Sequence, residues 1–183
     1  MMLNVKRLMN VSNTLNNQIR LSGIVKESIV DGPGIRYVIF TQGCKQRCIG
    51  CHNPEAQSLT AGKLYEIGDL VQEWRQNPLL KGITISGGEP FLQPEAVWQL
   101  VEQAIADQLD IVIYSGYYYE ELSNSLNKFI QLILANATYL IDGPYDQTFK
   151  NLNLLFRGSS NQRFIDLKET KTQNKVVLVV ETE

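Results

Sequence analysis

The chain has 183 residues, of which 44% are hydrophobic and 20% are charged, and its formal net charge is −2 at pH 7. These values suit one globular domain and argue against an extended basic surface for nucleic acid. The N-terminal stretch MMLNVKRLMNVSN has no continuous apolar run, so we expect neither a signal peptide nor a membrane span.

Residues 1–20 are polar and rich in asparagine, with little periodicity. We expect them to form an N-terminal extension that is either partly disordered or packed on the surface. Regular structure is expected to begin at residues 19–25. Residues 21–183 contain no internal repeat and no long linker, so we expect them to form a single domain.

Four short apolar runs predict β-strands. Their apolar residues stand on consecutive rather than alternate positions, which is typical of strands buried on both faces of a parallel sheet. The runs are Tyr37–Phe40, Ile83–Ser86, Ile111–Tyr114 and Tyr139–Ile141. Val176–Val180 is a further strand candidate that would pair at a sheet edge.

Apolar residues at helical spacing predict three helices between these strands. The stripes are Leu64, Ile67, Leu70, Val71 and Trp74; Ala96, Val97, Leu100, Val101, Ala104 and Ile105; and Leu122, Leu126, Phe129, Ile130 and Ile133. Pro94 opens the second stripe, where a proline suits the first helical turn. Strands alternating with helices favour an α/β fold. A complete barrel of eight such units needs about 250 residues, so we expect an incomplete, open parallel β/α barrel.

A short segment with glycine, cysteine or polar residues follows each of the four strands. The first strand is followed by a cysteine-rich loop, and the others by Gly87-Gly88-Glu89, Ser115-Gly116 and Asp142-Gly143. The carboxyl ends of parallel strands share one edge of the fold, where the working site lies. We therefore expect the four loops to form one site, in which Asp142 either contacts a ligand or caps a helix.

All three cysteines of the chain, Cys44, Cys48 and Cys51, stand in the first of these loops. An odd, clustered set is a poor disulfide framework and fits a reducing compartment, so we expect a cytoplasmic protein. The C-x-x-x-C-x-x-C spacing brings three thiolates around one loop. This is one ligand short of closing a cubane cluster or a tetrahedral metal site, and such a gap leaves a coordination position open for chemistry.

Three hypotheses explain these cysteines. In the first, they bind three irons of a 4Fe–4S cluster, whose fourth iron is free to take a small ligand with an amine and a carboxylate. In the second, they bind zinc together with His52, although His52 is adjacent to Cys51 and the two side chains diverge. In the third, they are ordinary buried cysteines, which the intervening Lys45 and Arg47 disfavour.

The cysteine spacing after a strand resembles the signature of the radical S-adenosylmethionine (SAM) enzymes. More narrowly, VDGPGIR at residues 30–36, followed by the cysteine loop and CHNP, resembles the activating enzymes of glycyl-radical enzymes. SGGEP, YSGY, LIDGPYD and RGSSNQR, with the compact length, are most similar to the branch that activates anaerobic ribonucleoside-triphosphate reductase. The resemblance covers roughly residues 22–162. Many superfamily members carry an aromatic residue at the position of Gly50, but this branch tolerates glycine there.

The resemblance implies an oxidoreductase with a 4Fe–4S cluster and SAM as cofactors. The implied cluster ligands are Cys44, Cys48 and Cys51. The residues implied to bind the cofactors are Gly50, Cys51, His52, Gly87, Gly88, Glu89, Ser115 and Gly116. At the paired glycines, the backbone carbonyls or the Glu89 carboxylate would accept hydrogen bonds from the ammonium of SAM. The implied catalytic residues, Asp31 and Arg36, would lie beside the radical site and help to seat the partner's glycine loop.

The resemblance also implies the substrate and the electron donor. A 5′-deoxyadenosyl radical formed from SAM would remove a hydrogen from a glycine Cα of anaerobic ribonucleoside-triphosphate reductase, and a flavodoxin-like protein would supply the electron. Arg157–Gln162 would either dock this partner or form a solvated polar turn. An activase of another glycyl-radical enzyme, such as pyruvate formate-lyase, and a radical SAM enzyme for a small molecule are alternatives with the same chemistry. A non-catalytic metal-binding interaction module is the alternative from a different class.

Overall fold

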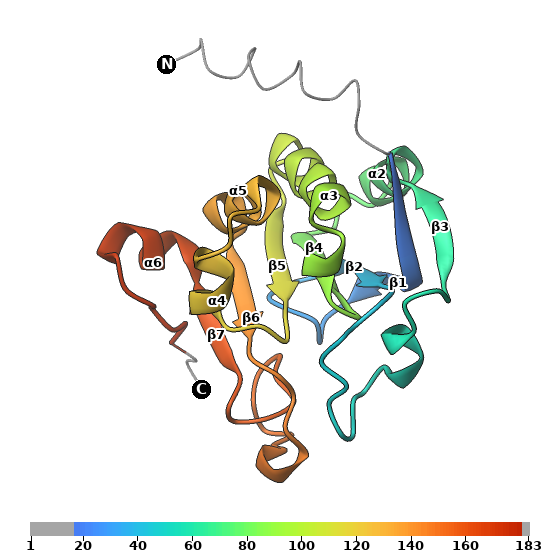
Figure 1. The fold of residues 1–183 in the computed structure, drawn as a ribbon. Coiled ribbons are helices and arrows are strands. Elements are labelled where there is room, and N and C mark those ends of the chain that lie inside the picture. Colours follow the sequence, from blue (N-terminus) through green and yellow to red (C-terminus); the bar gives the residue numbers. More distant parts are fainter. Residues whose placement is uncertain (1–16, 181–183) are drawn as a thin grey trace.

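The computed structural model describes residues 17–180, and its centre is a seven-stranded sheet (Figure 1). The strands, in the order β3-β1-β2-β4-β5-β6-β7 across the sheet, are β1 (Gln18–Ser28), β2 (Arg36–Thr41), β3 (Lys63–Glu66), β4 (Gly82–Gly87), β5 (Asp110–Tyr114), β6 (Tyr139–Asp142) and β7 (Arg163–Asp166). The α-helices are α2 (Ile67–Arg75), α3 (Pro94–Ala106), α4 (Tyr119–Ser123), α5 (Lys128–Asn136) and α6 (Leu167–Gln173).

The middle of the sheet is parallel and its margins are antiparallel. β2, β4, β5 and β6 pair in parallel, and these are the four strands that the sequence predicts. β1 pairs antiparallel with β2 and β3, and β7 with β6. The predicted C-terminal strand forms an isolated bridge, Leu178 to Ile165, beside β7. The fold is therefore a mixed α/β fold, as predicted. The sequence does not predict β3 and β7, and it predicts β1 only as the start of regular structure.

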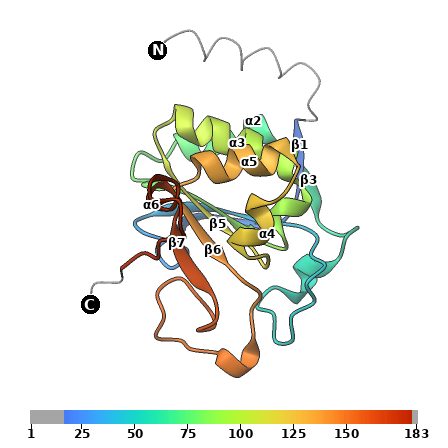
Figure 2. The ribbon, with the colours of Figure 1, turned by 60° about the vertical axis from the view of Figure 1, so that its left-hand side comes forward.

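The central strands are buried on both faces, which explains their unbroken apolar runs. On one face, Ile39, Ile83, Ile113 and Leu140 pack against the helices. Figure 2 shows α2, α3 and α5 as a layer over this face. The opposite face carries a smaller cluster, in which Val112 of β5 and Ile141 of β6 pack with Phe164 of β7.

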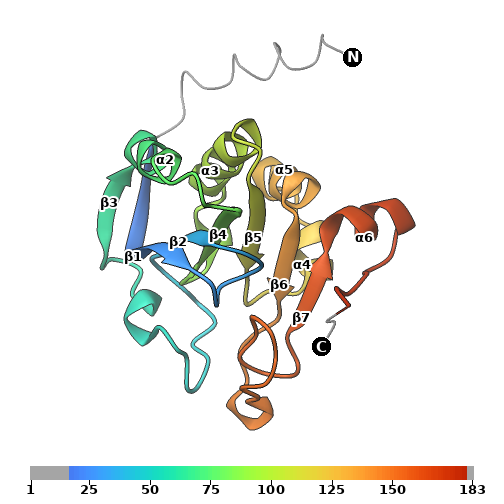
Figure 3. The same cartoon turned by 180° about the vertical axis from the view of Figure 1, so that it is seen from behind.

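The opposite face carries the connection between β1 and β2, residues 29–35, visible from behind in Figure 3. The carbonyl oxygen of Asp31 in this segment accepts a hydrogen bond from the hydroxyl of Thr84 on β4. A Cβ on Gly32 would lie 3.1 Å from Val112 on β5. These contacts show that the segment crosses the sheet and covers the faces of β4 and β5 that the helices leave free.

Two of the three predicted helices differ from the structure. Leu64 belongs to β3, since Lys63–Glu66 pairs with β1 and this tertiary pairing overrides the helical spacing. The third predicted helix is two helices, α4 and α5. Asn127 ends the gap between them by accepting a hydrogen bond from the backbone N–H of Phe129. Leu126 lies in this gap and is fully exposed. α3 begins at Pro94, as predicted.

Most of the predicted N-terminal extension, residues 1–16, lies outside the described residues, and β1 already begins at Gln18. None of the described helices has both the length and the apolar character that crossing a membrane requires.

Alanine substitutions of two aliphatic residues can test whether the third predicted helix is divided into α4 and α5. Ile133 on α5 is fully buried, so Ile133→Ala should lower the free energy of unfolding by about 2–5 kcal/mol because a cavity remains in the core. Leu126→Ala should change it by less than about 0.5 kcal/mol. Chemical denaturation of both variants measures the difference, and equal losses would contradict the observed exposure of Leu126.

Candidate functional site

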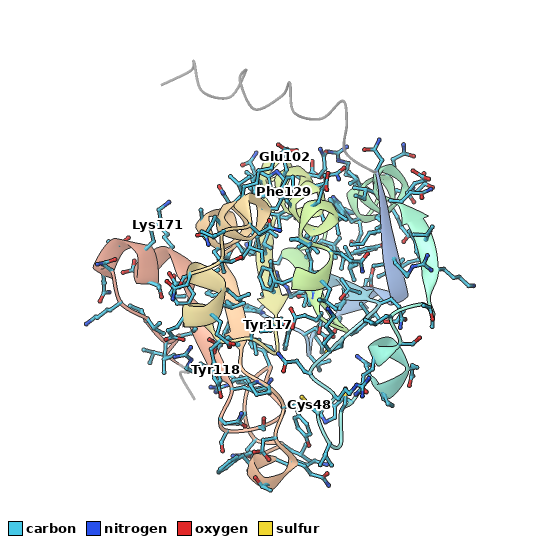
Figure 4. All side chains as sticks on the ribbon, viewed as in Figure 1. Cys48, Glu102, Tyr117, Tyr118, Phe129 and Lys171 are labelled. Carbon is cyan, nitrogen blue, oxygen red and sulfur yellow. The ribbon has the colours of Figure 1, made fainter. Side chains whose placement is uncertain are left out.

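The four predicted loops meet around one cavity of about 410 Å³ at the carboxyl ends of β2, β4, β5 and β6. In Figure 4, Cys48 lies at the end of the sheet where the β5–α4 connection with Tyr117 emerges. All three cysteines line the cavity. The other predicted site residues on its wall are Asp31, His52, Gly87, Gly88, Ser115 and Gly116. The cavity therefore gathers residues from segments that are far apart in the chain, from Val30 to Gln162.

The cysteine loop is closed at its base by backbone hydrogen bonds. The N–H of Gly43 donates to the carbonyl of Ala56 at 2.8 Å, and that of Cys44 to the carbonyl of Gln57 at 3.2 Å. The Gln42 amide binds two further carbonyls of the returning chain, those of Glu55 and Ser58. Because the two ends of the loop are fastened together, its three cysteines are held over the carboxyl end of β2.

The surroundings of the thiols suit a bound metal cluster. The three cysteines are free and partly buried. Burial raises the pKa of Cys44 and Cys48, so their thiolates need a positive partner. The backbone N–H groups of Gln46 and Arg47 donate to Cys44, and that of Tyr145 to Cys48. Such N–H groups stabilise cluster-bound sulfur. The soft thiolate set and these donors fit an iron–sulfur cluster.

The zinc hypothesis makes a different geometric demand, namely several ligands around a single ion. Among residues 17–180, no three His, Cys, Asp or Glu side chains gather closely enough for one metal ion. A cubane cluster does not require this, because each thiolate binds a different iron.

The Gly87-Gly88-Glu89 turn is fastened directly to the cysteine loop. The N–H of Gly88 donates to the carbonyl of Thr41 at 2.8 Å, and that of Glu89 to the carbonyl of Gly43 at 2.7 Å. A Cβ on Gly88 would come closer than 3.0 Å to the carbonyl oxygens of Gly43 and Ala56. Glycine is thus required here by the close approach of two backbones.

Glu89 has a different position from the two glycines before it. Its side chain is buried and is not part of the cavity wall. Its carboxylate accepts hydrogen bonds from the backbone N–H groups of Phe91 and Gly116 and from the Ser115 hydroxyl, at 2.8–3.1 Å. Burial raises the pKa of Glu89 to about 7. The sequence predicts two acceptors at this motif, the glycine carbonyls and the Glu89 carboxylate. Only the glycine backbone faces the cavity. The carboxylate instead joins the loop after β4 to the loop after β5.

Gly50 and His52 lie at the outer part of the site. Gly50 does not line the cavity, and a Cβ at this position would meet the side chain of Gln147 at 2.7 Å. Its φ of 74° also favours glycine. His52 is on the cavity wall with its ring 5.0 Å from the ring of Tyr145. The cysteine loop therefore packs against the segment that follows β6.

The two predicted catalytic residues are separated in the structure. Asp31 lines the cavity, and its carboxylate accepts a hydrogen bond from the Ser28 hydroxyl. Arg36 is completely buried and is not on the cavity wall. Burial lowers the pKa of Arg36 to about 10, so its guanidinium remains charged at neutral pH. The structure brings Asp31 to the cavity but not Arg36.

The segment between β6 and β7 supplies a wall of the cavity that the sequence does not predict. Tyr145, Leu152, Leu154 and Phe156 line it. The Tyr114 hydroxyl donates to the carbonyl of Phe156, which has a φ of 60°. LIDGPYD and RGSSNQR indicate the two ends of this segment, but NLNLLF between them has no periodicity that predicts a cavity wall.

The ambiguous polar residues of this segment have defined partners. Asp142 accepts a hydrogen bond from the first backbone N–H of α4, at Tyr119, and pairs with Arg163. Of its two predicted roles, the structure thus supports the helix cap. In the Arg157–Gln162 turn, the Gln162 side chain accepts from the N–H groups of Gly158 and Ser159. Three of its residues, Arg157, Gly158 and Gln162, also reach the cavity wall.

Comparison with known proteins places the chain among iron–sulfur proteins. The family model for the 4Fe–4S single cluster domain matches residues 30–165. The chain is 34% identical over 142 residues to the anaerobic ribonucleoside-triphosphate reductase-activating protein of Vibrio cholerae, which covers 73% of this chain and 89% of that protein. For the Escherichia coli K12 protein of the same name, the identity is 32% over 143 residues, with shares of 73% and 90%.

A pyruvate formate-lyase-activating enzyme is also similar. The chain is 36% identical over 135 residues to the enzyme of Clostridium pasteurianum, covering 69% of this chain but 55% of that protein. The chain thus spans about half the length of this relative.

The close approach at Gly88 can be tested with a matched pair of glycines. Gly88→Ala should destabilise the protein by at least about 1 kcal/mol and reduce the iron retained after anaerobic reconstitution, because the β4 turn must move away from the cysteine loop. Gly68→Ala on α2 meets nothing within 4 Å and should be neutral or stabilising by up to about 1 kcal/mol. Denaturation curves and iron analysis provide the readouts. Equal stability of the two variants would contradict the requirement for glycine at position 88.

Proposed function

The chain belongs to the 4Fe–4S single cluster domain family and is related to the anaerobic ribonucleoside-triphosphate reductase-activating proteins, and on this basis we propose that it is a SAM-dependent activase of a glycyl-radical enzyme. The observation that carries the proposal is the single cavity on which three free cysteines, the paired glycines and the β5 loop converge. Anaerobic ribonucleoside-triphosphate reductase is the proposed substrate. The chain covers 89% of the reductase-activating protein of Vibrio cholerae but 55% of the pyruvate formate-lyase-activating enzyme. This difference favours the reductase over pyruvate formate-lyase as the substrate.

In this proposal, Cys44, Cys48 and Cys51 hold a 4Fe–4S cluster through one iron each. When bound, the cluster and SAM would supply the one-electron chemistry that removes a hydrogen atom from a glycine Cα of the substrate protein. The cavity volume of about 410 Å³ is appropriate for a ligand of moderate size. The chain's own contribution is to bind the cofactor, orient it and keep water away from the reacting atoms.

The loops after β4 and β5 orient the cofactor in this proposal. The carbonyls of Gly87 and Gly88 would accept hydrogen bonds from the ammonium of SAM, and Ser115 and Gly116 would contact its ribose side. The buried Glu89 carboxylate supports this arrangement because it fixes both loops at once. A rigid second layer of this kind preorganises the groups that touch the ligand. Gly50 and His52 lie toward the adenine.

The exposed parts of the wall support a macromolecular substrate. Val30 and Leu152 line the cavity, yet their exposed fractions are 71% and 79%. The cavity thus reaches the molecular surface between two apolar side chains. In our proposal, the described chain from β1 onwards forms one open β/α barrel whose central strands are parallel. Its open side admits a glycine-bearing loop of the partner beside Asp31. A flavodoxin-like protein supplies the electron, in the reducing environment of the cytoplasm.

The ligand assignment predicts that each cysteine is indispensable. Replacement of Cys44, Cys48 or Cys51 with Ala should reduce iron well below about four per chain after anaerobic reconstitution and abolish release of 5′-deoxyadenosine from SAM, since three thiolates must anchor the cluster. Lys45→Ala is the matched control because Lys45 is exposed in the same loop. Iron analysis and chromatography measure the outcome. Full turnover in any of the three Ala variants would contradict the assignment.

The substrate can be identified by a direct comparison of two partners. The reduced, reconstituted protein is incubated with SAM and either anaerobic ribonucleoside-triphosphate reductase or pyruvate formate-lyase. We expect the glycyl doublet in the electron paramagnetic resonance spectrum only with the reductase. A doublet only with pyruvate formate-lyase would change the proposed substrate. Cleavage of SAM without a doublet on either protein would refute the proposed function.

A further inference from the structure

A buried threonine links the sheet to the wall of the cavity. Thr84 stands in the middle of β4 between Ile83 and Ile85, and all three side chains are completely buried. The two isoleucines pack against the helices, so Thr84 faces the opposite side of the sheet, under the segment 29–35. A buried hydroxyl at such a position must find hydrogen-bond partners within the protein.

The hydroxyl of Thr84 has two partners, and their chemistry fixes the direction of both hydrogen bonds. It accepts from Nε of Arg36 at 2.7 Å and donates to the carbonyl oxygen of Asp31 at 2.7 Å. A guanidinium can only donate and a carbonyl can only accept. The single hydroxyl proton is therefore committed to Asp31, and the charge of Arg36 polarises this bond.

Arg36 completes the attachment of the segment. Its terminal nitrogens donate to the carbonyls of Pro33, Ile83 and Asp110 at 2.6–2.9 Å. Asp31 and Pro33 belong to the segment 29–35, whereas Ile83 and Asp110 belong to β4 and β5. The guanidinium and the Thr84 hydroxyl together thus bind the segment at two carbonyls and fasten it to two strands.

The segment held in this way forms part of the cavity wall. Val30 and Asp31 are its only members on the wall. Gly32 and Gly34 have φ angles of 140° and 75°, which most other residues avoid. Backbone bonds to Thr84 and Arg36 therefore hold a chain that would otherwise have many conformations. The carbonyl that Thr84 binds belongs to Asp31 itself.

We propose that Thr84 is a positioning residue for the protein substrate: its hydroxyl fixes the Val30–Asp31 wall against which the glycine-bearing segment is seated. This inference rests on the proposed function, because it assigns a side of the same cavity to the partner. Thr84 contacts neither the cysteine loop nor the Gly87-Gly88 turn through its hydroxyl. Loss of this hydroxyl should therefore weaken the binding of the partner more than the binding of the cofactors.

The matched variants are Thr84→Val and Thr84→Ser. Valine has a similar shape but no hydroxyl, so Nε of Arg36 and the carbonyl of Asp31 both lose their partner. Serine keeps the hydroxyl. For each reconstituted variant, we would measure the KM for the partner, the KM for SAM, and the number of glycyl radicals formed per SAM cleaved.

For Thr84→Val we expect a rise of about tenfold in the KM for the partner, because the partner must order a wall that the two lost hydrogen bonds no longer fix. The KM for SAM should stay within about twofold and fewer radicals should form per SAM cleaved. Thr84→Ser should restore the wild-type values. If Thr84→Val does not fold, Thr84→Ala carries the test, since it also removes the hydroxyl, and the same partner-specific defect is expected.

Two results would overturn the inference while leaving the proposed function intact. One is a Thr84→Val protein with the wild-type KM for the partner and the wild-type yield of radicals. The other is an equal loss with SAM and with the partner, which would show a general structural role. Failure of the wild-type protein to form a glycyl radical on any glycyl-radical enzyme would instead refute the proposed function, and the inference with it.

Discussion

The site depends on how closely the backbone leaving β4 can approach the backbone leaving β2. The two backbones are joined by hydrogen bonds from Gly88 to Thr41 and from Glu89 to Gly43. This contact is possible because Gly88 has no side chain to separate them. It places the paired glycines beside the cysteines through contacts between the two backbones. The chemistry of the cysteines and that of the glycine turn can therefore act on one ligand.

Two buried ionisable residues organise opposite ends of β4. At the carboxyl end, Glu89 binds the β5 loop through Ser115 and Gly116. At the amino end, Arg36 binds carbonyls of β4, of β5 and of the segment 29–35. Burial opposes the charge of both residues, and the hydrogen bonds to their charged forms offset part of this cost. Each residue uses its charge to hold backbone groups, so that other residues can contact the ligand.

The sequence predicts the parts of the fold and site that follow local rules. Consecutive apolar residues identify the four parallel strands because both faces of such strands are buried. The cysteine spacing and the double glycine indicate the site because a loop brings these groups together. β3 escapes prediction because it is short and is defined by its pairing with β1. Leu126 fits a helical stripe by spacing, and only the cap at Asn127 separates the helices.

Tertiary contacts decide the roles of the polar residues near the site. Asp31 and Arg36 are five positions apart in one motif, yet only Asp31 reaches the cavity. Thr84 lies in an apolar run, where the sequence gives no reason to single it out, and its partners come from a segment about fifty positions earlier. A motif therefore shows which segment of the chain lies near the site. Which of its residues touch the ligand and which hold the cavity wall depends on how the sheet is packed.

The two sides of the cavity suit different binding partners. The cysteines and the glycine turn are attached to the strand ends at several points, which suits a cofactor that must be held in one orientation. The wall on the other side consists of Val30, Asp31 and the segment around Leu152, and its apolar members are largely exposed. Exposed apolar side chains beside a reactive centre lose contact with water only when a partner covers them. A protein substrate would therefore complete the enclosure of the site at the moment of reaction, which this small sheet does not accomplish by itself.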